Sequence, residues 1–197
     1  MRFFRPARDD SIRRNAVCTF LQTAFMWGIF LAVLPAGVLE LQEALGIPRF
    51  EPGPWAWAAF ALFWLAGLTG IYCGSLFVRF GAGTPFPLDE TTRLVIAGPY
   101  RWVRNPMAIL GIFQGVMVGV WLGSWPVVLY AVCGVFAWHM LARPFEERDL
   151  ERRFGAEFTE YRDAVRNWIP SARPYRKVMG AREPGLSQAE GPVADAR

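Results

Sequence analysis

The sequence predicts an all-α integral membrane protein with about four transmembrane helices, including a C-terminal helical hairpin that is followed by a cytoplasmic amphipathic helix. Three observations predict this class. The chain of 197 residues is 53% hydrophobic and contains nine Trp and sixteen Phe, which is more apolar surface than a soluble domain of this length buries. Three long runs carry no Asp, Glu, Lys or Arg. Dense polar motifs border the last and longest run on both sides.

The first two charge-free runs cover residues 15–39 and 52–78. Each is long enough for one tilted helix, because roughly 20 residues at about 1.5 Å rise cross the hydrocarbon core. They predict spans at about 16–39 and 54–78. A cleaved signal peptide is the competing interpretation of the basic and then apolar N-terminus. The first run is too long for a typical signal core, and further spans follow it.

The third run, 105–142, is about twice the length of one span and therefore predicts a hairpin. A breaker cluster, Gly-Ser-Trp-Pro at 123–126, lies at its middle and lets the chain reverse. The spans are expected at about 106–122 and 126–142. The hairpin brings the two bordering motifs together at one membrane face: GPYRWVRNP before it and RPFEERDL after it.

Basic residues are distributed unevenly among the predicted loops. Five arginines precede the first span and many follow the second and fourth spans, whereas loop 40–51 has three Glu and only Arg49. The positive-inside rule therefore predicts that both termini and both motifs are cytoplasmic. Arginine outnumbers lysine twenty to one, which suits a GC-rich bacterial genome, so the bacterial inner membrane is the expected location.

The polar regions outside the spans differ in character. The loop after the second span is rich in Gly, Pro and Thr and is too long to be a mere connector, which favours binding. Pro144 fits the first turn of a new helix, and apolar residues at helical spacing among charges predict an amphipathic helix at 144–168, interrupted or bent near Gly155. Residues 171–197 predict a disordered tail, which leaves a single domain over 1–170.

The two motifs offer groups that suit one ligand. The first supplies Tyr100 and Trp102 as aromatic faces, Arg104 as a cation, and Asn105 beside a helix start at Pro106; the second supplies Arg143, Glu146 and Glu147. Aromatic faces and carboxylates suit an amino group or another cation. An arginine and a helix N-terminus suit a carboxylate. S-adenosylmethionine, with its cationic sulfur, has both features, and a zwitterionic lipid headgroup satisfies the same requirements.

These residues also have simpler structural interpretations. Tyr100 and Trp102 are typical of an aromatic interfacial belt, and Arg104 fits the positive-inside pattern. Arg143 and Glu146 could form a surface ion pair of little energetic value. Their joint occurrence at both ends of one hairpin favours a functional site.

The two motifs resemble the signature of a known enzyme family. GPYRWVRNPMAILG resembles the GxYxxxRHPxYxG pattern of the isoprenylcysteine carboxyl methyltransferase family, which is related to the phospholipid methyltransferases, and RPFEERDLERRFGAEFTEYRDAV is similar to that family's second block. The resemblance covers 81–170, with both blocks in order. It implies an integral membrane methyltransferase that uses S-adenosylmethionine on a lipophilic or small acceptor at the cytoplasmic face. The acceptor could be a carboxylate, a thiol or an amine.

The resemblance also implies roles for individual residues in a cofactor loop at 81–105 and in the second block. The expected cofactor-binding residues are Thr92, Arg93, Leu94, Val95, Gly98, Tyr100, Asn105, Pro106, Glu146 and Glu147. Arg143 is expected to orient the acceptor, and Arg104 is the other catalytic candidate. Asn105 replaces the family's usual His, which keeps hydrogen bonding but removes proton transfer. Ala108 replaces a Tyr and leaves space where an aromatic ring would stand.

Two other functions are compatible with such a scaffold. A membrane reductase of the steroid-reductase type has a broadly similar helical layout and uses NADPH, without demanding the acidic pair. A membrane protein that has lost catalysis would account for Ala108. The single histidine, His139, and three cysteines without paired spacing predict no metal site. The expected partners are the bilayer and the acceptor, with no nucleic acid.

Overall fold

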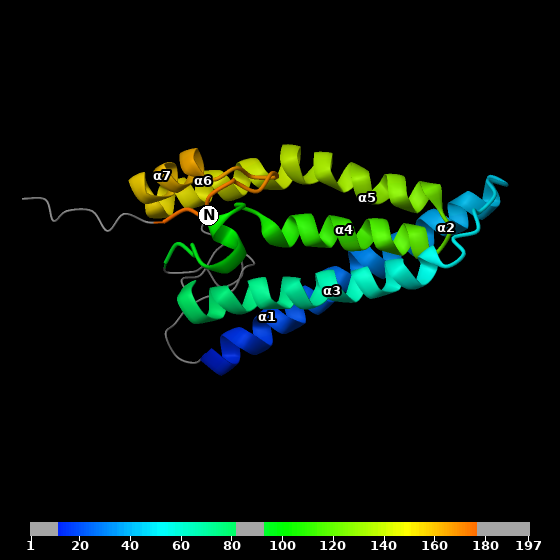
Figure 1. The fold of residues 1–197 in the computed structure, drawn as a ribbon, viewed down its shortest axis with the longest axis horizontal. Helices are drawn as coiled ribbons and strands as arrows, with labels where there is room; N and C mark the ends of the chain where they lie inside the picture. The colour runs from blue at the N-terminus through cyan, green and yellow to red at the C-terminus, as the bar shows by residue number, and fades with distance from the viewer. Residues whose placement is uncertain (1–11, 82–92, 177–197) are drawn as a thin grey trace, which may run out of the picture.

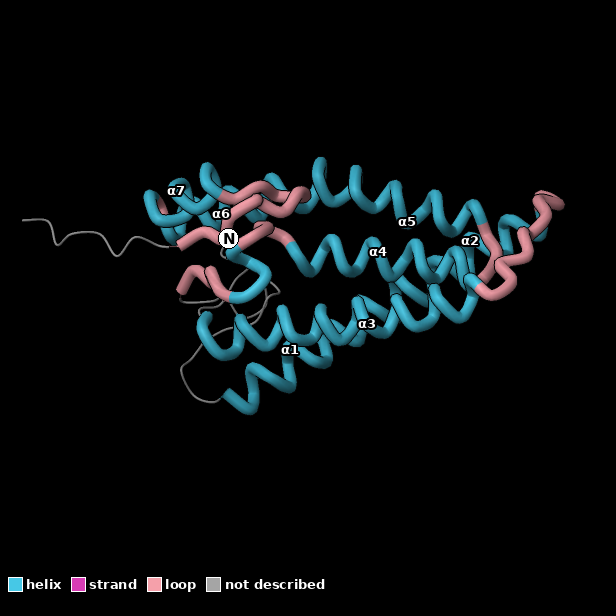
Figure 2. Tube along the Cα trace, viewed as in Figure 1, coloured by secondary structure: helices cyan, strands magenta, loops and turns pink. Residues whose placement is uncertain are grey.

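A computed structural model describes residues 12–81 and 93–176, with side chains from residue 16 onward. Within these ranges every regular element is a helix. The helices lie along the long axis of an elongated bundle (Figure 1). The loops gather at its two ends (Figure 2), one beside α2 and the other beside α6 and α7.

The first helical segment is continuous and contains a wide turn. It runs from α1 (Ile12–Trp27) through a π-helical turn (Gly28–Val33) into α2 (Leu34–Ala44), and the Leu34 N–H bonds to the Ile29 carbonyl, five residues back. Pro35 explains this turn, because proline lacks an N–H and its ring presses on the carbonyl four residues earlier. The helix therefore extends beyond the expected span.

The second helical segment forms the centre of the bundle. α3 (Trp55–Leu76) continues into a second π-helical turn (Phe77–Gly81) and packs against α4 (Pro106–Trp121). A Cβ added at Gly67 would lie only 3.0 Å from Gln114 Nε2 of α4 and 3.2 Å from the Trp27 ring of α1. Gln114 is fully buried and donates to the Phe63 carbonyl at 3.3 Å. Glycine thus permits the close approach of three helices.

α4 and α5 (Trp125–Ala137) form the predicted helical hairpin. Gly123 at its turn has φ +65°, and Ser124 caps α5 by accepting from the Val127 N–H at 3.2 Å. The turn is fastened to the loop between α2 and α3, since the Phe50 N–H donates to the Gly123 carbonyl at 2.8 Å and the Ser124 hydroxyl donates to Gln42 Oε1. These contacts fix the end of the bundle that lies far from the polar motifs.

The last long helix does not end where the sequence predicts. α5 continues through a third π-helical turn (Trp138–Ala142) into α6 (Arg143–Phe154), and the Arg143 N–H bonds to the Trp138 carbonyl five residues back. The expectation of a new helix at Pro144 is therefore wrong, because the wide turn accommodates the proline within one helix. The charge-free part, from Trp125 to Ala142, measures about 27 Å at about 1.5 Å per residue. We take it as the membrane-spanning part, with α6 projecting beyond it.

The amphipathic helix expected at 144–168 is divided between two helices. Gly155, with φ +52°, ends α6 and precedes α7 (Ala156–Ala164). The chain then returns along the loop before α4, where the Ser171 N–H donates to the Trp102 carbonyl at 2.7 Å. The disordered tail expected from residue 171 is thus wrong for 171–176, and 177–197 lie outside the described residues.

The fold class predicted from the sequence is confirmed. Among the described residues, three helical segments are long and apolar enough to cross a membrane: Ala16–Ala44, Trp55–Gly81 and Trp125–Phe154. The fourth expected span, α4, is a shorter apolar helix of 16 residues packed between α3 and α5.

Candidate active site

An extended segment, 93–97, leads into the site and holds two parts of the fold together. Its side chains alternate in direction, as in any extended chain. Val95 and Ala97 pack at the end of α3, whereas Leu94 and Ile96 pack against α7. The first cluster is built on Cys73, Leu76 and Tyr100, and the second on Phe158, Tyr161 and Val165. The end of α3 and the start of the site are thereby joined to α7.

Gly98 and Tyr100 shape the next turn, a short 3-10 helix (Gly98–Arg101). Gly98 has φ +54°, and a Cβ there would lie 3.0 Å from Leu76 Cδ1, so glycine is required. Tyr100 is only 5% exposed, and its carbonyl accepts the Tyr161 hydroxyl at 2.6 Å. Burial raises the pKa of both tyrosine hydroxyls. The Tyr100 side chain therefore packs this loop instead of lining the cavity described below.

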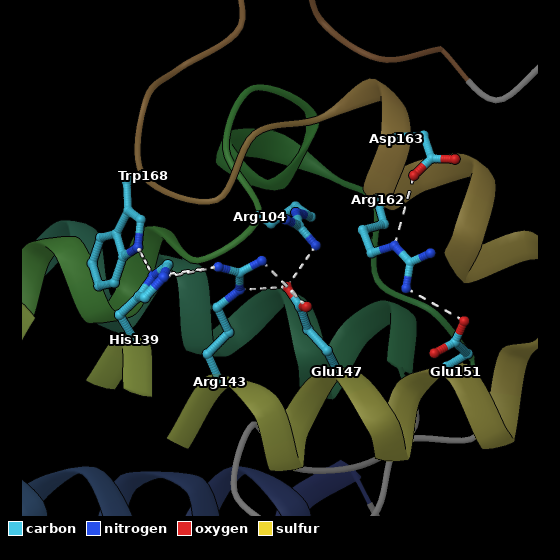
Figure 3. A network of polar contacts seen from close by, with 8 residues as sticks. All are labelled: Arg104, His139, Arg143, Glu147, Glu151, Arg162, Asp163 and Trp168. Carbon is cyan, nitrogen blue, oxygen red and sulfur yellow. Dashed lines mark hydrogen bonds and ion pairs between the residues drawn. The ribbon is translucent and has the colours of Figure 1, made fainter. Parts of the chain in front are cut away.

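A network of charged side chains joins the two sequence motifs (Figure 3). Glu147 of α6 accepts from Arg104 Nη1 at 2.8 Å and from Arg143 Nε at 2.8 Å, with Arg143 Nη2 at 3.4 Å. The Arg104 side chain is only 10% exposed, and burial lowers its pKa while the Glu147 carboxylate opposes that change. Arg104 and Glu147 are 43 positions apart, so the hairpin brings them together.

The network continues through Arg143 to the histidine and a tryptophan. Trp168 Nε1 donates to His139 Nδ1 at 3.1 Å, and Arg143 Nη1 lies 3.3 Å from the His139 ring nitrogens. His139 precedes Arg143 by one helical turn, and Glu147 follows it by one turn (Figure 3). The guanidinium of Arg143 is therefore held from both sides.

A small cavity lies within this network. Its volume is about 30 Å³, which is room for about one water molecule or one carboxylate. Its lining residues are Arg104, Asn105, Arg143, Glu146, Glu147, Leu150, Phe158, Tyr161 and Asn167. Two buried donors on these residues, Arg104 Nε and Asn167 Nδ2, have no hydrogen-bond partner in the part of the chain that the structure describes. An unsatisfied buried donor costs about 1–3 kcal/mol, so an acceptor group supplied from outside the chain would stabilise these two atoms.

The two adjacent carboxylates of α6 differ in their surroundings. Glu147 is paired with two arginines, whereas Glu146 makes no ion pair with any residue that the structure describes. Removal of its carboxyl group from water, together with repulsion by Glu147, raises the pKa of Glu146 to about 7, against an opposing effect of Arg104. Glu146 as a whole is exposed, and it borders the cavity.

The structure gathers five of the residues singled out from the sequence around this cavity: Arg104, Asn105, Arg143, Glu146 and Glu147. Asn105 caps α4, since its Oδ1 accepts from the Ala108 N–H at 3.3 Å, and the buried Pro106 begins that helix. The arrangement matches the helix start expected at this motif.

The other predicted site residues lie elsewhere or are used for packing. Thr92 lies outside the described residues, and Arg93 is exposed. The side chains of Leu94, Val95 and Tyr100 belong to the two apolar clusters. The side chains of Val95 and Tyr100 are buried there, whereas that of Leu94 is half-buried.

Sequence reasoning missed several residues that line or support the cavity. Tyr161 and Phe158 carried a signal as the apolar side of the amphipathic helix, but not their contacts with the loop before α4. Asn167 carried no signal. Its position depends on the return of the chain after α7, where the Arg104 N–H donates to the Arg166 carbonyl at 3.0 Å.

Comparison with known proteins identifies the family of this chain. The family model described as phospholipid methyltransferase matches residues 55–157, which is just over half of the chain. The chain belongs to the phospholipid methyltransferase family. The matched region begins at the first residue of α3 and includes the hairpin and the cavity residues up to Leu150. Membership of this family agrees with the resemblance of the sequence motifs, and the apolar helices are compatible with a multi-pass membrane protein.

A curated relative gives a more specific comparison. The methanethiol S-methyltransferase of Mycobacterium tuberculosis (strain ATCC 25618 / H37Rv) is 29% identical over 149 residues, which cover 70% of this chain and 54% of that protein. The chain thus spans about half the length of the curated relative that it matches.

Proposed function

We propose that this methyltransferase transfers the methyl group of S-adenosylmethionine to a small or lipophilic thiol at the cytoplasmic membrane face. The observation that carries the proposal is the network in which Arg104 and Arg143 share Glu147. Both guanidinium groups line the cavity, and those of their N–H groups that Glu147 does not use can donate to an anionic acceptor such as a thiolate. The name of the mycobacterial relative supports a thiol.

The residues at the cavity fit the polar end of the proposed cofactor. The unpartnered donors Arg104 Nε and Asn167 Nδ2 suit an α-carboxylate. When bound, S-adenosylmethionine supplies an electrophilic methyl group on a cationic sulfur. A cavity of about 30 Å³ has the size of a carboxylate, so we assign it only this end of the molecule.

The remaining residues of the loop and of α4 receive supporting roles. Arg93, Leu94 and Val95 would contribute main-chain contacts to the cofactor, and Gly98 and Tyr100 would hold the loop in place. Asn105 and Pro106 would present the start of α4, where helix N–H groups favour an anion. We assign Glu147 to holding both arginines, because both its contacts are already made with them.

Arg143 is the residue proposed to orient the acceptor. Its side chain is 27% exposed, so part of the guanidinium remains accessible while Glu147 and His139 fix its direction. Methyl transfer requires an in-line approach of the acceptor, and positioning and exclusion of water would supply most of the rate. An acceptor thiolate held by a fixed guanidinium would meet the requirement for positioning.

Labelled methyl transfer tests this function. The purified protein in lipid vesicles would be given S-adenosylmethionine with a labelled methyl group, together with an alkanethiol, an aminophospholipid or a lipophilic carboxylic acid. We expect label in a methyl thioether, and we expect Arg143→Gln to lose most of that activity while Arg162→Gln, on the surface of α7, keeps it. Label found only in a methylated amine or a methyl ester would refute the thiol, and no label in any product would refute the proposed reaction.

A further inference from the structure

Three consecutive residues after α7 each contact a different part of the site. The Arg166 carbonyl accepts from the Arg104 N–H at 3.0 Å. Asn167 lines the cavity, and its buried Nδ2 has no partner among the described residues. Trp168 Nε1 donates to His139 Nδ1 at 3.1 Å. Asn167 is therefore flanked on both sides by a hydrogen bond to another segment of the site.

The histidine that accepts the Trp168 N–H also contacts Arg143. Arg143 Nη1 lies 3.3 Å from both ring nitrogens of His139, one helical turn away (Figure 3). An indole and a guanidinium can only donate, so His139 Nδ1 is the acceptor and the neutral ring carries its proton on Nε2. A protonated ring would offer no acceptor to Trp168 and would bring two cations within 3.3 Å of each other.

The Trp168–His139 hydrogen bond lies near the edge of the membrane-spanning part. His139 precedes Ala142, the last charge-free residue, by three positions, which is about 4.5 Å along a helix. Water competes little for polar groups at this depth, so loss of the indole N–H would be poorly compensated. An aromatic belt residue also suits this depth, but such a residue requires no fixed partner.

We infer that the Trp168–His139 hydrogen bond is a positioning contact that holds Asn167 and Arg143 at the cavity. The inference rests on the proposed function, in which Asn167 binds the cofactor carboxylate and Arg143 orients the acceptor. Both residues line the cavity, one from the chain after α7 and the other from α6. The hydrogen bond joins these two segments, so its loss would free one side of each residue.

Binding of S-adenosylhomocysteine tests the effect on Asn167. Trp168→Phe keeps an aromatic ring but removes the N–H, and we expect it to weaken binding by about threefold to tenfold, the range for one lost hydrogen bond. In Asn167→Ala no donor is left to position, so adding Trp168→Phe should cause no further loss. Trp55, the first residue of α3, is 74% exposed. Trp55→Phe is the matched control and should bind as wild type.

Methyl transfer to the alkanethiol tests the effect on Arg143. His139→Leu removes the acceptor for the indole N–H, whereas His139→Asn keeps an oxygen close to the position of Nδ1. At saturating S-adenosylmethionine, we expect His139→Leu to lower kcat/KM for the thiol by about threefold to tenfold. His139→Asn should recover most of this loss.

A magnetic resonance measurement reports on the contact without turnover. His139 is the single histidine of the chain, so ¹⁵N-labelled histidine gives the signals of this ring alone in protein without a histidine tag. We expect Nδ1 to be unprotonated and hydrogen-bonded, and Nε2 to be protonated. Trp168→Phe should move the Nδ1 resonance to that of a nitrogen without a hydrogen bond, and Trp55→Phe should leave it in place.

Four results would count against separate parts of this reasoning. An Nδ1 resonance unchanged in Trp168→Phe would show that the hydrogen bond is absent. Wild-type binding and turnover in Trp168→Phe and His139→Leu, or equal losses in Trp55→Phe, would reduce Trp168 to an interfacial anchor. Additive losses in Trp168→Phe and Asn167→Ala would show that the bond does not act through Asn167. A wild-type protein that binds S-adenosylhomocysteine but methylates no thiol would refute the thiol acceptor alone, because resonance and binding still test the positioning contact.

Discussion

The ion pair between Arg104 and Glu147 should be energetically important, in contrast to the more exposed ion pair between Glu151 and Arg162. Arg104 Nη1 lies 2.8 Å from Glu147 Oε1, and the two side chains are 10% and 21% exposed. A hydrogen bond to a charged group contributes about 1.5–3 kcal/mol when it is shielded in this way, whereas exposed pairs contribute about 0–1 kcal/mol. We therefore expect a coupling free energy of about 2 kcal/mol between these residues.

A double-mutant cycle measures this coupling. Arg104→Met, Glu147→Gln and the double variant would be unfolded reversibly by denaturant in mixed micelles, and their free energies of unfolding compared with wild type. Glu151 and Arg162 provide a matched control, because this pair also links α6 to another element, lies at 3.3 Å, and is 49% and 30% exposed. Its coupling should be about 0.5 kcal/mol or less.

The two coupling free energies can also contradict the proposed burial of the network. If the Arg104–Glu147 coupling were no larger than that of the control pair, the network would not be a shielded junction between the two motifs. Glu147→Gln alone should destabilise the protein by more than Glu151→Gln, because it leaves two guanidinium groups without their carboxylate. Equal destabilisation by the two variants would contradict the burial on which the argument depends.

Three further predictions follow from single contacts. Gly123→Ala should destabilise the protein by about 2 kcal/mol or more, because its Cβ would clash with the Phe50 carbonyl. Gly46 has nearly the same φ but lies in open space, so Gly46→Ala should cost about 1 kcal/mol. Equal losses of unfolding free energy in the two variants, measured in denaturant, would exclude the clash. Tyr161→Phe leaves the buried Tyr100 carbonyl unsatisfied and should lower the free energy of unfolding by about 1–3 kcal/mol. A decrease below about 0.5 kcal/mol would show that this hydrogen bond does not stabilise the loop. Because the pKa of Glu146 in the folded protein, about 7, lies above its ordinary 4.5, its destabilising effect is absent below pH 4.5 and complete above pH 7. Glu146→Gln should therefore gain stability relative to wild type between pH 5 and pH 8, and parallel stability curves would contradict the raised pKa.

The fold class could be predicted because the membrane imposes strong constraints on the sequence. Charge-free runs and the breaker cluster at 123–126 were sufficient for the hairpin. Pro35 and Pro144 were the misleading signals, since proline ordinarily ends or begins a helix. In both places the chain stays helical through a π-helical turn that ends two residues earlier. An open break would leave main-chain groups unsatisfied in lipid, so the wide turn is the less costly solution.

The candidate site was only partly predictable. The hairpin placed the two motifs at one end of the bundle, but two arginines and two glutamates allow several pairings. Which carboxylate meets Arg104 depends on the rotation of α6 after its π-helical turn, and the sequence gives no measure of that rotation. The position of Asn167 depends on contacts between the chain after α7 and the loop before α4, such as the Ser171–Trp102 hydrogen bond. Such contacts between distant segments leave no periodic pattern in the sequence.

Equilibrium binding of S-adenosylhomocysteine tests the central claim most directly, namely that the hairpin joins both motifs into one cofactor site. We predict saturable binding to the wild-type protein and unchanged binding in Arg162→Gln. In both Asn105→Ala and Glu147→Gln, binding should be weakened at least about tenfold, or about 1.4 kcal/mol. Absence of binding to the wild type, or wild-type affinity in either motif variant, would contradict it.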